Sequence, residues 1–168
     1  MPSPREKVSA VDPIWTALRQ QAEAMAGREP ALAGFVHATI LQHDQLEQAL
    51  SYHLARKLGG EDLSPLAIRE MFDDAIAADD VIGQAVRADL SAVFERDPAC
   101  HSYLDAFLFY KGFHALECYR VAHWLWSGGR KAMALFLQSR ISQLFAVDVH
   151  PAVQQTRSCR ADLRADGD

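Results

Sequence analysis

The stretch FLFYKGFHALECYRVAHWLWSGGRKAMALFLQSRISQLFAVDVHPA, residues 107–152, decides the fold of this chain. From about Phe107 to Trp126 its apolar residues surround most of a helical wheel, which predicts one long buried helix. Gly128 and Gly129 end that helix, and a last helix is expected over 130–145. Residues 147–149 have strand character, and His150-Pro151 turns the chain away from them.

The sequence upstream of this stretch repeats the helical pattern five times. Asp12-Pro13 and Ser64-Pro65 are helix-start signals, because a capping side chain precedes a proline in the first turn. Further helices are expected from Pro30, from about Asp44 to the Gly59-Gly60 pair, and after Asp79. The segment 96–103 interrupts the pattern and is predicted to be a loop. The fold class is therefore an all-α, multi-helix bundle with a short extended exit.

Composition and charge exclude several classes of protein. The chain has 168 residues, of which 49% are hydrophobic and 23% charged, as in an ordinary folded domain. A net charge of −5 without a basic stripe argues against a nucleic-acid partner. We expect no membrane span and no secretory leader, because no apolar run is long enough for either. The three cysteines are odd in number and include no Cys-x-x-Cys pair, which is typical of a protein in a reducing cytoplasm.

Three segments are expected. Residues 1–146 form the helical domain, and residues 147–152 form a junction. Residues 153–168, VQQTRSCRADLRADGD, have no periodicity and little apolar content, so we expect a poorly ordered tail unrelated to what precedes it.

The sequence predicts no metal or cofactor site. Seven histidines include no pair at a spacing of four and no His-Glu-x-x-His motif. His114 and His123 are nine residues apart, on opposite sides of one helix. The two double glycines sit at helix ends, where they act as C-caps rather than as phosphate loops. A metal- or haem-binding bundle is the weakest interpretation of this chain.

Several ordered motifs carry a resemblance to a known family. They are ERDPA around Asp97, then YKGFHAL, YRVAHWLW, GRKAMALFLQ and VDVHPA from residue 110 onward. In this order they resemble the serine acetyltransferases (serine O-acetyltransferases), from the N-terminal helical domain to the start of the left-handed β-helix. The resemblance implies transfer of an acetyl group from acetyl-CoA to L-serine, toward cysteine, in the cytoplasm.

Two residues match functional positions of that family. Asp97 resembles the carboxylate that binds the serine ammonium group, and Asp148 resembles the carboxylate that orients the catalytic histidine. Each has a plainer interpretation. Asp97 before Pro98 could be a helix N-cap, and Asp148 could cap the turn at His150-Pro151.

The family's catalytic histidine lies in an Asp-His-Ala-Thr-Gly stretch that these 168 residues do not contain. The resemblance places the acetyl-CoA groove and the peptide that docks into cysteine synthase beyond the junction as well. We therefore expect a truncated chain that is inactive alone, binds no acetyl-CoA or other cofactor by itself, and does not dock into cysteine synthase. It is expected to form a homo-oligomer through its helices. The alternative function is a non-catalytic helical oligomerisation module.

Overall fold

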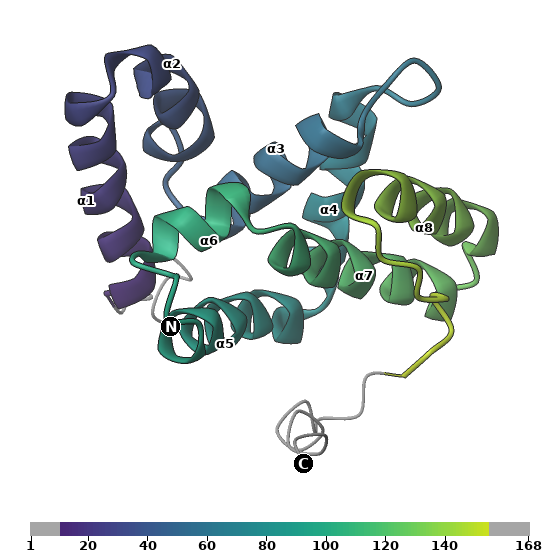
Figure 1. The fold of residues 1–168 in the computed structure, drawn as a ribbon. Coiled ribbons are helices and arrows are strands. Elements are labelled where there is room, and N and C mark those ends of the chain that lie inside the picture. Colours follow the sequence, from purple (N-terminus) through teal and green to yellow (C-terminus); the bar gives the residue numbers. More distant parts are fainter. Residues whose placement is uncertain (1–10, 155–168) are drawn as a thin grey trace, which may run out of the picture.

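The computed structural model describes residues 11–154, and within them all regular structure is helical (Figure 1). The all-α prediction is confirmed. The elements are α1 Pro13–Arg28, η1 Pro30–Leu32, α2 Ala33–Val36, η2 His37–Leu41, α3 Leu46–Leu58, α4 Pro65–Ala78, α5 Asp80–Arg96, α6 Tyr103–Phe109, α7 Lys111–Ser127 and α8 Lys131–Phe145. Residues 147–149 have extended character in the sequence but form no strand in this part of the chain. No helix within residues 11–154 is long and apolar enough to cross a lipid bilayer.

Helix starts follow the capping signals of the sequence. Asp12 and Ser64 each accept a hydrogen bond from a first-turn amide, at 3.1 and 3.2 Å, and a proline follows each of them. Asp79 and Ser102 cap α5 and α6 in the same way. These side chains satisfy amides that have no partner inside the helix, which fixes where each helix begins.

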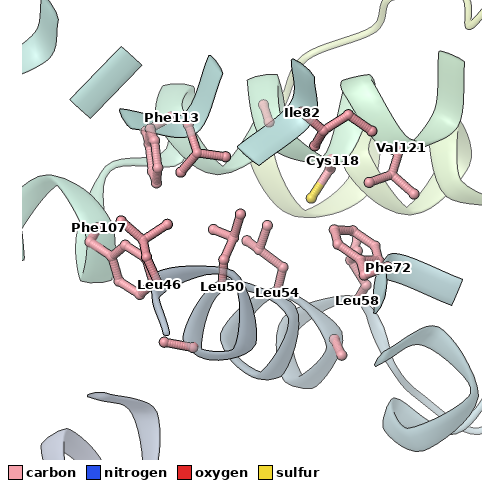
Figure 2. Close-up of a cluster of buried hydrophobic side chains, with 14 of the residues drawn as sticks. Leu46, Leu50, Leu54, Leu58, Phe72, Ile82, Phe107, Phe113, Cys118 and Val121 are labelled. Carbon is pink, nitrogen blue, oxygen red and sulfur yellow. The ribbon is translucent and has the colours of Figure 1, made fainter. Parts of the chain in front are cut away.

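The core is built around α3, which lies in the middle of the molecule (Figure 1). One face of α3 presents four leucines at a spacing of four, and each is at most 1% exposed. Figure 2 shows these leucines facing side chains from α4, α5, α6 and α7; the labelled set is Leu46, Leu50, Leu54, Leu58, Phe72, Ile82, Phe107, Phe113, Cys118 and Val121. Burial of this shared apolar surface is the main source of stability.

The single helix predicted from about Phe107 to Trp126 is wrong: the chain breaks at Tyr110, between α6 and α7. Tyr110 is extended (φ −83°, ψ 109°). Two buried histidines stabilise the break by donating to carbonyls in the last turn of α6, which the helix itself leaves unpaired. His53 Nε2 lies 3.1 Å from the Leu108 oxygen, and His114 Nε2 lies 2.7 Å from the Phe107 oxygen.

The helix expected from Pro30 to about Ile40 is present, but its type changes along its length. It starts as the 3₁₀ turn η1, continues as α2 and widens into η2, a π-helical turn over His37–Leu41. The extra residue in a π turn widens the backbone locally.

Long-range ion pairs join the helices at the periphery. Arg87 on α5 donates to Asp12 at 2.7 Å and to Glu47 at 2.5 Å, so that it connects the starts of α1 and α3 to α5. These two hydrogen-bonded partners raise the pKa of Arg87 against the opposing effect of burial.

α5 runs antiparallel to α7, because residues at the start of α5 line a cavity together with residues at the end of α7.

Candidate functional site

The loop between α5 and α6 holds Asp97. Its Oδ1 accepts from the Ala99 amide at 2.9 Å, and its carbonyl accepts from the Cys100 amide at 3.0 Å, so the loop is a tight turn closed by Asp97. Ser102, not Asp97, is the N-cap of the next helix. The N-cap interpretation of Asp97 is therefore wrong, and its half-buried carboxylate follows the end of α5.

Tyr110 lies beside this loop. Partial desolvation raises the pKa of its phenol, and the neighbouring Cys100 thiol and the Asp97 and Asp105 carboxylates act in the same direction. The sequence analysis did not single out Tyr110, although it is the first residue of the YKGFHAL motif. A carboxylate beside a phenol in a half-buried loop can accept hydrogen bonds from an ammonium group.

The exit segment after α8 holds Asp148. Gln138 on α8 donates its amide Nε2 to Asp148 Oδ1 at 2.9 Å. The turn at Pro151 is closed by His150, whose Nδ1 accepts from the Ala152 amide at 3.1 Å. Asp148 therefore does not cap this turn. His123 on α7 donates to the Pro151 oxygen at 2.7 Å, which fastens the exit segment to the helices.

The structure does not bring Asp97 and Asp148 together. Gln154, at the end of the described exit segment, lines a cavity of about 410 Å³ together with Asp79, at the start of α5. Asp97 follows the other end of α5, a helix of 17 residues, and is therefore roughly 25 Å away along its axis. In Figure 1 the loop before α6 and the segment after α8 accordingly lie on opposite sides of the molecule.

A buried carboxyl group lies between α5 and α7. Glu117 is 1% exposed, and its Oε2 is 3.4 Å from the guanidinium of Arg120, which also pairs with Asp89. Burial raises the pKa of Glu117 well above its ordinary value; the Arg120 charge opposes this and Asp89 supports it. No sequence pattern pointed to this group, because Glu117 lies in a helix that is apolar on most sides.

Other candidate chemistry is limited to single groups. Within residues 11–154, no three histidine, cysteine or acidic side chains are placed to share a metal ion. Cys100 and Cys118 are free buried thiols, and burial raises the pKa of Cys118 well above its ordinary value. Cys159 and most of the predicted tail lie outside the described residues.

Comparison with known proteins gives one consistent family. The family model "Serine acetyltransferase, N-terminal" matches residues 14–118. The serine acetyltransferase of Salmonella typhimurium is 46% identical over 149 residues, which are 89% of this chain and 55% of that protein. This chain therefore spans about half the length of the curated relatives it matches.

Solved structures agree in fold as well as sequence. The Neisseria gonorrhoeae serine acetyltransferase in complex with serine superposes with a TM-score of 0.82 at 43% identity, over 87% of this chain and 60% of that one. The Brucella abortus enzyme in complex with coenzyme A gives a TM-score of 0.83 at 43% identity, over 84% and 57% of the two chains.

Proposed function

The chain belongs to the serine acetyltransferase family, and from this we propose that its helices serve an enzyme that acetylates L-serine with acetyl-CoA, in the cytoplasm and toward cysteine. The family match over residues 14–118 carries this proposal. Solved relatives that hold serine and coenzyme A support the choice of substrates.

We assign Asp97 to the serine ammonium group and Asp148 to the catalytic histidine. The position of Asp97 in a half-buried turn beside Tyr110 supports the first role, because a partly desolvated carboxylate binds a cation more strongly than an exposed one. The hydrogen bond from the Gln138 amide supports the second role. It orients the Asp148 carboxylate through Oδ1 and leaves Oδ2 to accept from an imidazole.

We further propose that a complete serine site takes Asp97 from one copy of the chain and Asp148 from another. Serine is only a few ångströms long, whereas the length of α5, roughly 25 Å, separates Asp97 from the cavity that Gln154 of the exit segment lines. Assembly of the helical domain is then a condition for activity. This assigns the oligomerisation role, the alternative function, to the same domain.

The 168-residue polypeptide by itself is expected to have no measurable turnover. It contains no Asp-His-Ala-Thr-Gly stretch, and loss of a general base alone lowers rates by about 10²–10⁴. An assay of the purified polypeptide with acetyl-CoA, L-serine and a thiol-detecting dye tests this. Turnover above the buffer rate would contradict it.

A chimera tests the function directly. Residues 1–152 replace the matching segment of the Salmonella typhimurium enzyme, and acetyl transfer is measured. We expect an active enzyme in which Asp97→Asn raises KM for serine by about tenfold or more. Asp148→Asn is expected to lower kcat by on the order of 10²–10⁴. The matched control is Asp105→Asn, which removes a neighbouring carboxylate without a proposed role.

The two variants together test the shared site. Co-expressed Asp97→Asn and Asp148→Asn chimeras should regain part of the activity, because a mixed assembly contains some sites with both carboxylates. No regain in mixed assemblies verified by differently tagged copies would refute the shared site. A folded, inactive parent chimera would refute the proposed function itself.

A further inference from the structure

A second cavity, of about 470 Å³, lies between the α2–η2 segment and α3, away from both aspartates. Its lining combines apolar and basic groups; the residues that matter here are Phe35, Ala38, Tyr52, His53, Arg56 and Lys57. The described ion pairs involve only Arg69, Arg87 and Arg120 as cations, so neither Arg56 nor Lys57 pairs with a carboxylate within residues 11–154.

Arg56 is held in place by its neighbour on the helix. Its Nη1 donates to the Tyr52 hydroxyl at 2.8 Å, and its guanidinium lies 5.5 Å from the centre of the Tyr52 ring. A second guanidinium, that of Arg69, lies 5.7 Å from the same ring. Burial is the main cause of the lowered pKa of both His53 and His114, and the charge of nearby Lys57 acts in the same direction.

The opposite wall of the cavity carries the aromatic ring of Phe35. The Phe35 side chain is 40% exposed, and its ring lies 6.1 Å from that of His53. His53 is neutral there, since burial lowers its pKa to about 3, and it adds no charge. The π turn over His37–Leu41 contributes Ala38 and Thr39 to this wall, and α2 contributes Gly34 and Phe35.

We propose that this cavity binds a small organic anion, with a carboxylate or phosphate between Arg56 and Lys57 and an apolar or aromatic group against Phe35. Neither cation pairs with a carboxylate within residues 11–154, and an anion bound between them would neutralise both charges. Their place in the last turn of α3 also complements the helix dipole, which explains why the cations are tolerated without a ligand. The proposal is independent of acetyl transfer to serine.

Titration of the full 168-residue chain with phenyl phosphate and with inorganic phosphate tests the site. Backbone amide shifts are followed by NMR at low salt. We expect saturable shifts centred on Gly34, Phe35, Ala38 and Tyr52, with phenyl phosphate several-fold tighter than phosphate because only phenyl phosphate reaches the Phe35 ring.

Two variants and a charge-matched control separate the contributions. Arg56→Gln with Lys57→Gln should weaken both ligands on the order of tenfold, since each cation makes a charge-assisted hydrogen bond. Phe35→Ala, which keeps both charges, should weaken only phenyl phosphate. Arg28→Gln with Lys131→Gln removes the same total charge elsewhere and should change neither affinity.

Three results would overturn the proposal. They are shifts that do not saturate, shifts centred on the 97–102 loop instead of the cavity, and equal affinities in the Arg56→Gln/Lys57→Gln variant and its control. Circular dichroism of each variant verifies that the helices are intact. A loss of binding is then caused by the changed side chains of the site and not by unfolding.

Discussion

Two histidines buried in a neutral state are expected to lower the free energy of unfolding by about 4 kcal/mol when the pH falls from 8 to 5, while the raised pKa of buried Glu117 acts in the opposite direction. His53 and His114 are 4% and 1% exposed, and their rings lie 5.2 Å apart, edge to face. Burial, with the charge of the other histidine, lowers the pKa of His53 to about 3. Burial lowers the pKa of His114 to about 4, against a hydrogen bond to Phe107.

The magnitude follows from proton uptake by the unfolded chain. The unfolded histidines bind protons below their ordinary pKa of 6.5, whereas the folded ones stay neutral down to about 4 and 3. The contribution of these two histidines to the free energy of unfolding therefore falls as the pH drops below 6.5. At pH 5, about 1.5 pH units lower, each histidine destabilises the folded state by about 2 kcal/mol. Against a typical total of about 5–15 kcal/mol this loss is large.

Urea unfolding followed by circular dichroism, between pH 8 and pH 4.5, measures the effect. The double variant His53→Gln/His114→Gln keeps an amide donor near the α6 carbonyls but cannot titrate in this range. It should be less stable at pH 8, because its packing is poorer. It should also lose the part of the pH dependence of the unfolding free energy that the two histidines cause. His101→Gln, which changes an exposed histidine, should keep the full pH dependence. The histidine contribution is the difference in pH dependence between the parent chain and the double variant, and the same pH dependence in both would refute the reasoning.

Three further perturbations test separate features. Glu117→Gln should reduce any fall in stability as the pH rises from 6 to 9, because burial raises the pKa of Glu117 well above its ordinary value and Gln cannot ionise; unfolding curves over that range check this. Arg87→Gln should cost about 1–3 kcal/mol in urea unfolding, since it leaves two partly buried carboxylates without their shared cation. Ala146→Gly should raise stability by about 0.5–1 kcal/mol in thermal unfolding, because Ala146 ends α8 at φ 58°; a lower melting temperature would contradict this.

Local signals in the sequence predicted most of the helices. Caps such as Asp12 and Ser64 act on amides within three residues, and the apolar spacing that buries Leu50 and Leu54 acts within one or two turns. The motifs around Asp97 and Asp148 were enough to identify the family, which the comparisons confirm. The roles of the two aspartates stay predictions.

Tertiary contacts decided the features that the sequence analysis missed. The break at Tyr110 depends on His53, 55 residues away from the carbonyl it binds, and no helical periodicity contains that contact. The buried Glu117 and the basic cavity beside Phe35 arise only when separate helices pack together.

By itself, then, the sequence determined the helical class, the starts of the helices and the family, since all of these depend on neighbours along the chain or on the order of motifs within it. Only the tertiary structure decided where α6 ends, which ionisable groups lose contact with water, and that the loop of Asp97 lies at the far end of α5 from the exit segment. The reason is physical: burial and through-space electrostatics depend on distances between residues that are far apart in sequence.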